Sequence, residues 1–321
     1  MEEIKTYTTI TKQEVRIHDV EIQNGIPKLW NIRYSNSVSI PKALVKYYSS
    51  NEFGFNVLRE HNIWATHPFD FNDPFDCSIQ MWDIESFPYC EMKRVVEEFV
   101  FLGSSSNLNI FETRKIFFEL VLRFIGIYCL NEKSKSDLFW GYYNNHKGFS
   151  IEFNTDIINI FFGNTPCKIE YKDFEIGDKI SLNPNDLYNN ELYTKVLRWI
   201  TLKKDDWIHE NEWRYLFMDI DLGNTNRKRA FPLNAITGIT LGYKFFSEAT
   251  NTKLLNRSTT ENIFNGDLEI NYTFKILHFL FENPEIKLKQ VLLSEDFSLT
   301  EERIYIRKIK DNQVVVEIER E

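Results

Sequence analysis

The 321-residue sequence is poor in the two residues that interrupt regular structure, with 12 glycines and 9 prolines. Low-complexity disordered chains and collagen-like repeats need many more of them, so both classes are excluded. The four cysteines lie far apart and form no CxxC pair. This spacing argues against a disulfide framework or a zinc site and favours a reducing cytoplasm. The hydrophobic fraction of 43% is enough to bury a proper core.

Several motifs of common enzymes are also missing. The sequence has no Walker A loop, GxGxxG fingerprint, GxSxG elbow or HExxH pair, so it gives no sign of the usual nucleotide, dehydrogenase or hydrolase sites. Its N-terminus lacks the basic and apolar regions of a secretory signal. The most apolar stretch, 116–130, contains Glu119 and Arg123 and is shorter than the roughly 20 residues that a membrane helix needs. We therefore expect a cytoplasmic protein without a membrane partner.

Charge gives a weak constraint on partners. Lys and Arg total 38 and Asp and Glu total 47, which leaves a formal net charge of −9. A protein of this balance does not coat nucleic acid by charge alone. Two short basic runs, 203–204 (KK) and 227–229 (RKR), are interpreted as solvated residues that could still attract a polyanion.

The order of predicted elements favours an α+β fold with a mixed or split antiparallel sheet and flanking helices, because short strands alternate irregularly with helices. Residues 1–40 alternate weakly and are predicted to be a β-rich extension, and residues 41–321 to form one α+β domain. Predicted strands are 43–48, 63–66, 125–130, 149–153, 213–218, 236–241 and a hairpin at 303–318. Predicted helices are 53–60, 91–101, 108–124, 136–144, 187–200 and 258–264.

The first segment that could carry chemistry is residues 71–76 (FNDPFD), which its Asn-Asp-Pro core predicts to be a loop. Asp73 and Asp76, together with Asn72, offer oxygen atoms that could bind a cation or accept hydrogen bonds from ribose hydroxyls. The same residues are typical of an Asx turn, in which the side chains cap their own backbone. The sequence leaves both interpretations open.

The second segment is residues 140–148 (WGYYNNHKG). On a helix, Trp140 and Tyr143 share a face, and Tyr143 shares one with His146. The result would be an aromatic platform for a flat ring, with a titratable imidazole at its end. The alternative is a core helix whose histidine caps its own C-terminus.

The third segment is residues 207–217 (WIHENEWRYLF). If it is extended, Glu210, Glu212 and Arg214 point to one face. Two carboxylates and a guanidinium are costly to bury without a function or mutual pairing. The alternative is a solvated strand face with a paired glutamate and arginine.

In this order, the segments resemble the bacterial domain-of-unknown-function family DUF 2971. Its pattern runs from a YKY strand through an FNDPF loop and an aromatic helix with His and Gly to a WxxExExR segment. The corresponding stretches here are 46–48, 71–75, 140–148 and 207–214, followed by an I-x-L-G strand at 239–242. Val45 departs from the pattern, which usually has an aromatic residue there. The resemblance covers residues 41–310.

The resemblance implies a bacterial effector, since members of the family occur near phage-defence and toxin-like genes. It also implies an antitoxin or another defence-system partner. The motif order is similar to the plan of ADP-ribosyltransferases, which implies an ADP-ribosyltransferase-like fold, NAD as co-substrate and transfer to a nucleic-acid or protein target. No metal is expected.

In that plan, a carboxylate holds the ribose and stabilises an oxocarbenium-like state, an aromatic ring stacks on nicotinamide, and an arginine grips the pyrophosphate. The resemblance therefore implies catalytic roles for Glu212, Glu210, Tyr143 and His146. It implies cofactor-binding roles for Lys46, Tyr47, Asn72, Asp73, Trp140 and Arg214.

Two other functions fit the same residues. In a metal-dependent nuclease-like effector, a magnesium ion would be held by carboxylates and an amide and the nucleic-acid backbone by basic side chains. The metal ligands would be Asn72, Asp73, Glu210 and Glu212, and the basic residues Lys203, Lys204, Arg227 and Arg229. In a non-catalytic binding or sensor module, all the motifs would be structural.

Overall fold

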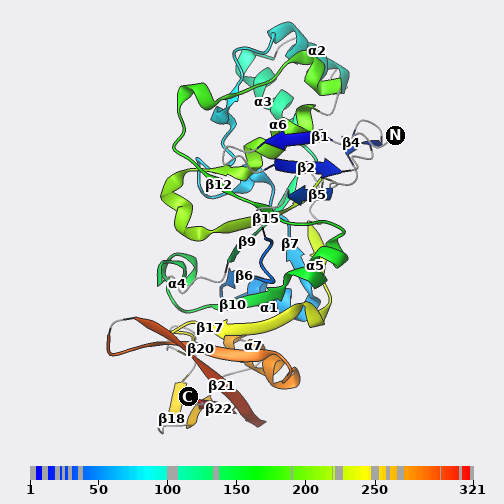
Figure 1. Ribbon diagram of the computed structural model, residues 1–321. Helices are drawn as coiled ribbons and strands as arrows, with labels where there is room; N and C mark the ends of the chain where they lie inside the picture. The colour runs from blue at the N-terminus through cyan, green and yellow to red at the C-terminus, as the bar shows by residue number, and fades with distance from the viewer. Residues whose placement is uncertain are drawn as a thin grey trace. The chain divides into compact units, whose positions relative to one another are not determined.

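The structure is a computed structural model, shown in Figure 1. It describes residues 5–8, 14–18, 22–23, 26–27, 31–34, 39–99, 108–132, 137–188, 191–218, 220, 227–246, 253–257, 261–265, 271–296, 298–310 and 313–318. The chain divides into two compact units. Unit 1 comprises Met1–Ser39, Trp64–Cys129 and Gly163–Arg227, and unit 2 comprises Ile40–Ile63, Leu130–Phe162 and Lys228–Glu321. Strands β7 (Asn62–Trp64) and β9 (Gly126–Glu132) run through points at which the chain passes from one unit to the other.

Unit 1 combines short strands with helices packed on an aromatic core. The α-helices that its described residues form are α2 (Tyr89–Phe99), α3 (Ile110–Val121) and α6 (Glu191–Thr201). Its strands are β1 (Lys5–Thr8), β2 (Glu14–His18), β3 (Ile22–Gln23), β4 (Ile26–Pro27), β5 (Asn31–Tyr34), β8 (Trp82–Asp83), β11 (Cys167–Lys168), β12 (Glu170–Tyr171), β13 (Ile180–Ser181), β14 (Leu202–Lys203) and β15 (Glu212–Phe217).

The pairing of these strands places β15 between β11 and β9. The pair of β11 and β15 is antiparallel, with Cys167 opposite Arg214. Strands β12 and β14 pair in parallel, so that Tyr171 lies opposite Lys203. At the N-terminus, β1, β2 and β5 form an antiparallel sheet. The described part of residues 1–40, which were predicted to be β-rich, therefore contains strands, and β2 is one of them.

Helix α3 has a well-defined start because Asn109 and Glu112 form a reciprocal capping box. One face of the helix buries Phe117 and Phe118 in the core of unit 1. The core also contains the indole rings of Trp82 and Trp199, whose centroids are 5.9 Å apart. Burial of these large rings fixes the rotation of α3 and leaves its opposite face for polar residues.

Unit 2 contains the helices α1 (Glu52–Glu60), α4 (Asp137–Asn144), α5 (Thr155–Phe162) and α7 (Tyr272–Glu282) among its described residues. Its strands are β6 (Ala43–Tyr48), β10 (Phe149–Asn154), β16 (Lys228–Ala230), β17 (Ile236–Leu241), β18 (Lys253–Arg257), β19 (Glu261–Asn265), β20 (Lys287–Leu293), β21 (Leu299–Lys310) and β22 (Gln313–Ile318).

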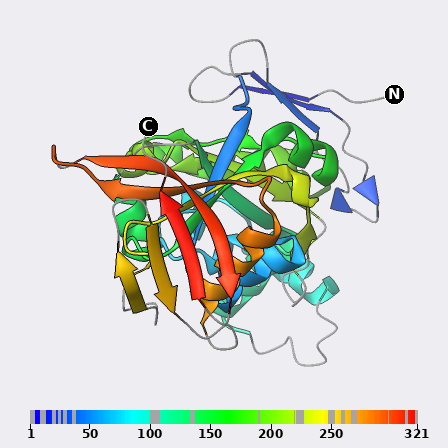
Figure 2. The same cartoon turned by 90° about the horizontal axis from the view of Figure 1, so that it is seen from below.

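The sheet of unit 2 follows the order β6-β10-β17-β20-β21-β22-β19-β18. Its C-terminal strands can be followed in Figure 2, where β21 and β22 are drawn in orange-red and red. Strands β17 and β20 are parallel, whereas β10 and β17, and also β20 and β21, are antiparallel. The sheet is therefore mixed and the chain is α+β, as the sequence predicts.

The predicted elements differ from the structure most clearly at 258–264. This segment was expected to be a helix, but β19 (Glu261–Asn265) pairs with β22 on one side and β18 on the other. The pairing with residues 313–317 is a non-local contact that overrides local propensity. Strands 43–48 and 236–241 are confirmed with their predicted bounds.

In the part of the chain that the structure describes, no helix is both long and apolar enough to cross a membrane.

Candidate functional site

The site in unit 1 starts from strand β15, which is buried along its whole length. Trp213 and Tyr215 alternate with Glu212 and Arg214, and all four side chains are at most 3% exposed. The period of two expected for a strand is therefore present. The charged residues of β15 do not form the solvated face that was one of the two interpretations of this segment.

Arg214 is fully saturated by its neighbours. Its Nε donates to Glu212 Oε1 at 2.8 Å, and Nη2 donates to Asp76 Oδ2 at 2.6 Å and to Glu212 Oε2 at 3.2 Å. Nη1 donates to the Ile200 carbonyl at 2.8 Å and to Cys77 Sγ at 3.2 Å. These bonds use the five N–H donors of the guanidinium, so Arg214 keeps none for a ligand.

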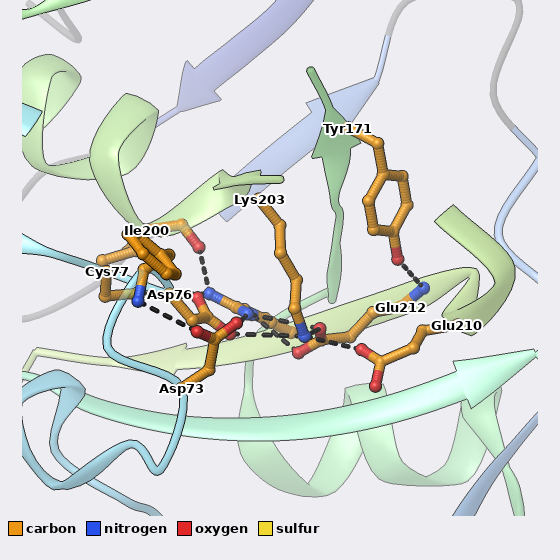
Figure 3. Close-up of polar contacts among 10 residues, drawn as sticks. Asp73, Asp76, Cys77, Tyr171, Ile200, Lys203, Glu210 and Glu212 are labelled. Carbon is orange, nitrogen blue, oxygen red and sulfur yellow. Dashed lines mark hydrogen bonds and ion pairs between the residues drawn. The ribbon is translucent and has the colours of Figure 1, made fainter. Parts of the chain in front are cut away.

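Lys203 joins the carboxylates of three different segments. Its Nζ lies 2.6 Å from Glu210 Oε2, 2.9 Å from Glu212 Oε2 and 3.3 Å from Asp76 Oδ2. The ammonium also lies 5.2 Å from the centre of the Trp207 ring. Figure 3 shows these side chains converging from β14, β15, the 3₁₀ turn before β15 and the 71–76 loop. We call Asp76, Lys203, Glu210, Glu212 and Arg214 the charged cluster.

Glu210 reaches the cluster from outside the strand. It ends a 3₁₀ helix, Asp205–Glu210, and is followed by Asn211 with a φ of 42°. Asparagine tolerates this left-handed conformation better than most residues. The turn at Asn211 separates Glu210 from β15, whereas the extended reading of the sequence placed Glu210 on the same strand as Glu212.

The pairing controls the protonation of the cluster. Burial alone would raise the pKa of Glu212, but the nearby charges of Arg214 and Lys203 outweigh it and hold that pKa well below its usual range. Burial would lower the pKa of Lys203, and the carboxylates of Glu212 and Asp76 raise it instead. Arg214 is likewise held charged by Asp76 and Glu212 against the effect of burial. Glu212, Lys203 and Arg214 are therefore ionised inside the protein.

Two neutral groups border the cluster. Burial, followed by the charge of Asp76, raises the pKa of the Cys77 thiol, so this cysteine is not a thiolate nucleophile. Burial and the charge of Glu212 also raise the pKa of Tyr171. The Tyr171 hydroxyl oxygen accepts the backbone N–H of Glu212 at 2.8 Å.

The 71–76 loop carries Asp76 into the cluster. Asp73 Oδ1 accepts the Phe75 N–H at 2.9 Å, and the Asp76 N–H donates to the Asp73 carbonyl at 3.2 Å. The Asx turn is confirmed. Asn72 is exposed at the start of this turn.

The loop is tied to helix α3 by a buried histidine. His67 Nδ1 accepts the Phe69 N–H at 3.1 Å, and Nε2 lies 2.9 Å from the Leu122 carbonyl at the end of α3. Because Nδ1 is an acceptor, we assign the proton to Nε2. Burial is the largest of the effects that lower the pKa of His67. A neutral imidazole thus fixes the loop to the helix.

A cavity of about 400 Å³ lies between the loop and α3. Its walls combine aromatic rings, carboxylates and one ammonium group. The lining residues are Pro68, Phe69, Phe71, Asp73, Pro74, Asp76, Cys77, Ser78, Ile79, Lys115 and Glu119. Asp76 therefore belongs both to the wall of the cavity and to the buried charged cluster. We call this space the loop cavity.

The two aspartates on the wall differ in their bonding. Asp76 Oδ2 is held by Arg214 and Lys203, while Oδ1 has a contact of 3.4 Å with Cys77 Sγ. Asp73 Oδ2 has almost no exposed surface and accepts no hydrogen bond from the described residues. A thiol is a weak donor, so Asp76 Oδ1 retains most of its capacity to accept a hydrogen bond from a ligand.

The predicted aromatic platform lies in unit 2. The Tyr47 ring stacks on Phe139 at 5.3 Å and meets Trp140 edge-on at 5.0 Å. Trp140 is 5% exposed and Tyr47 is 8% exposed. Burial, with a further effect of Glu301, raises the pKa of the Tyr47 hydroxyl. These rings form an aromatic core on helix α4 and strand β6.

The other predicted residues of unit 2 are placed around this core. Tyr143 belongs to α4, but its side chain is outside the described residues. His146 has a φ of 63°, and its N–H donates to the Trp140 carbonyl at 2.8 Å, so the helix ends at this turn. Its own carbonyl accepts the Lys244 N–H at 2.7 Å. Lys46 lies on β6 opposite Ile151 of β10.

The basic runs were interpreted as solvated, and this was wrong for two residues. Lys203 is inside the charged cluster, and Arg227 is 4% exposed. Arg227 donates to the carbonyls of Ala65 at 2.7 Å and Ile125 at 2.8 Å. Neither side chain is available to follow a nucleic-acid backbone. Lys204 is on the surface, where it pairs with Asp206.

A metal site does not emerge from the described residues, which contain no group of three or more His, Cys, Asp or Glu placed to hold an ion. Asn72 and Asp73 lie on the loop, while Glu210 and Glu212 are bonded to Lys203. An ion between these glutamates would have to displace the ammonium.

Sequence reasoning missed three residues of the site, and it missed the pairing of a fourth. Asp76 was proposed as a ligand of a cation or of ribose hydroxyls, but its ion pairs with Arg214 and Lys203 were not expected. Lys203 was interpreted as solvated. Cys77 and Tyr171 had no signal of their own. The cost of burying Glu212 and Arg214 was the available clue, because it requires further charges nearby.

Comparison with known proteins gives one match. No curated protein and no solved structure is significantly similar to the chain. Residues 138–215 match the profile of the family described as "Protein of unknown function (DUF2971)". The matched stretch contains most of α4, most of β15 and every residue of the charged cluster except Asp76. The resemblance to DUF 2971 that the motifs indicate is therefore confirmed over residues 138–215.

Proposed function

We propose that this chain binds a nucleotide of the NAD type in the loop cavity and consumes it in a reaction of the ADP-ribosyltransferase type. The observation that carries the proposal is the position of Asp76. Its side chain lies on the cavity wall and forms ion pairs with the buried Arg214 and Lys203. A fixed carboxylate accepts hydrogen bonds from ribose hydroxyls. Phe69 and Phe71 on the same wall supply a surface for a flat ring.

The proposed reaction breaks the bond between ribose C1′ and the nicotinamide nitrogen. The electron pair of that bond leaves on the nitrogen, which becomes neutral, and the ribose develops oxocarbenium character. A nitrogen or oxygen of the acceptor then forms the new bond to C1′, and its proton passes to a carboxylate or to water. Asp76 would hold the 2′-hydroxyl, and the negative wall would stabilise the positive charge of the transition state.

This proposal changes the roles that the motif order implies. Both oxygens of Glu212 are bonded to Arg214 or Lys203, so we assign Glu212 and Arg214 to positioning Asp76. Glu210, bonded to Lys203 at 2.6 Å, has the same part. Trp140 is packed on Tyr47, so we assign the stacking on the ligand ring to the phenylalanines of the loop cavity instead.

A sensor that binds the same nucleotide without consuming it is the second candidate. The saturation of Arg214 and Glu212 favours it, because a fully paired cluster needs no reaction to explain its charges. In either form, the gene setting and motif order of the resembled family support an ADP-ribosyltransferase-like effector of phage defence or a toxin system. Its target would be a nucleic acid or a protein.

Titration calorimetry with NAD and chromatographic measurement of free nicotinamide, with and without cell lysate, test the proposal. We expect binding together with nicotinamide release, and loss of release in Asp76→Asn. Glu85→Gln, which removes an exposed carboxylate outside the cavity lining, is the matched control. Binding without release selects the sensor. Absence of both binding and release contradicts the proposed function.

A further inference from the structure

The charges on the wall of the loop cavity are not balanced. Its lining residues carry three carboxylates, on Asp73, Asp76 and Glu119, and one ammonium, on Lys115. Two of these carboxylates are in ion pairs: Glu119 Oε1 lies 3.8 Å from Lys115 Nζ, and Asp76 Oδ2 lies 2.6 Å from Arg214 Nη2. The described residues provide no lysine, arginine or histidine that forms an ion pair with Asp73. The cavity therefore presents a negative potential centred on Asp73.

The carboxylate of Asp73 is also poorly screened. Oδ1 is engaged by the Phe75 N–H, while Oδ2 has almost no exposed surface and no hydrogen bond from the described residues. A carboxylate oxygen withdrawn from water interacts more strongly with a nearby charge than an exposed one does. A cation in the loop cavity would gain from this interaction, and an anion would be repelled.

The aromatic part of the wall favours the same sign of charge. Phe69 is 37% exposed and lines the cavity. The Phe71 ring already has the Arg214 guanidinium at 5.2 Å from its centre. Ring faces attract cations through their quadrupole. A flat ligand that carries a positive charge would thus lie against an aromatic ring and within the field of the Asp73 carboxylate.

We propose that the loop cavity selects a flat cationic ring, and that it distinguishes the pyridinium of oxidised NAD from the neutral dihydropyridine of NADH. This inference rests on the proposed function and adds the charge selectivity and orientation of the ligand. The nicotinamide end enters the cavity, and the anionic pyrophosphate stays away from the carboxylates of the wall.

The test compares ligands that differ in ring charge. Calorimetry on the full chain measures the affinities for NAD and NADH, and for 1-methylnicotinamide and nicotinamide. We expect the charged member of each pair to bind about tenfold more tightly. Asp73→Asn keeps the Oδ1 acceptor of the Asx turn and removes the charge. It should lower the affinity for the charged ligands and bring each ratio close to one, while Glu85→Gln should leave both ratios unchanged.

The outcomes separate this inference from the proposed function. Equal affinity for NAD and NADH, unaffected by Asp73→Asn, overturns the charge selectivity and leaves nucleotide binding in place. Selective binding of 1-methylnicotinamide without binding of NAD supports the charge selectivity and contradicts the proposed function. If no ligand of either pair binds, both are wrong. A circular dichroism spectrum and a melting temperature equal to those of the parent show that Asp73→Asn is folded.

Discussion

The Arg214 guanidinium and the Asp76 carboxylate are 2.6 Å apart although 138 positions separate them in the chain. Arg214 is 0% exposed and Asp76 is 8% exposed, so the pair is inside unit 1. Each charge has been removed from water, and each depends on the other for compensation. The bond therefore fixes the 71–76 loop to strand β15 and sets the position of one wall of the loop cavity.

Loss of Arg214 should destabilise the protein strongly. Arg214→Met leaves Asp76, Glu210 and Glu212 with Lys203 as their one cation in the charged cluster, and removing one partner of a buried pair costs about 3–5 kcal/mol. Arg59→Met removes an exposed partner of Glu60 and should cost less than about 1 kcal/mol. Urea denaturation followed by tryptophan fluorescence measures both. Equal small losses would show that the cluster contributes nothing specific.

Lys203 and Glu210 should be energetically coupled. In Lys203→Met the carboxylates of Glu210 and Glu212 lose the ammonium that lies between them. Adding Glu210→Gln removes one of the repelling charges, so the double variant should be more stable than the sum of the single changes by about 0.5–3 kcal/mol. A double-mutant cycle in urea gives this coupling energy. Additive free energies would contradict the proposed network.

The stability of the protein should depend on pH through the protonation of His67. Burial lowers its pKa in the folded protein from 6.5 and Arg227 adds to this, whereas the hydrogen bond to the Leu122 carbonyl and the charge of Asp70 oppose it. Below about pH 6.5 the His67 side chain therefore binds a proton in the unfolded chain but not in the folded one. The free energy of unfolding falls as the pH decreases from there, until the pH reaches the pKa of His67 in the folded protein. His67→Asn keeps an acceptor for the Phe69 N–H and removes the titration.

Melting temperatures measured from pH 8 to pH 5 test this expectation. The acid-side fall should be smaller in His67→Asn and should persist in His278→Asn, which changes a half-exposed histidine beside Glu282. The same fall in the parent and in His67→Asn would exclude His67 as its source.

The sequence predicted the local parts of this fold better than its long-range pairing. Helix α3 was recognisable because its apolar period and its polar start coincide, and the capping box of Asn109 confirms that signal. Strand β19 was missed because its partner strand, β22, is about 50 residues away, and such pairing leaves no local pattern.

The site shows the same division. The alternation of β15 gave the common face of Glu212 and Arg214, and the cost of their burial required partners. The identity of those partners could not be predicted, since Lys203 and Asp76 come from segments whose local sequence is typical of a solvated turn. The charged cluster is set by the tertiary fold and not by any one motif.

The aromatic residues of α4 give the last prediction. Trp140 is 5% exposed and packs edge-on against Tyr47 at 5.0 Å, so Trp140→Phe should cost about 1–3 kcal/mol of stability through lost packing. The affinity of the Trp140→Phe variant for NAD should stay unchanged, because we assign ligand stacking to the loop cavity. Tyr142→Phe, at a side chain that is 66% exposed, should change neither quantity. Urea denaturation and calorimetry measure the two effects. A large loss of NAD affinity with unchanged stability would contradict this prediction and show that Trp140 takes part in ligand binding.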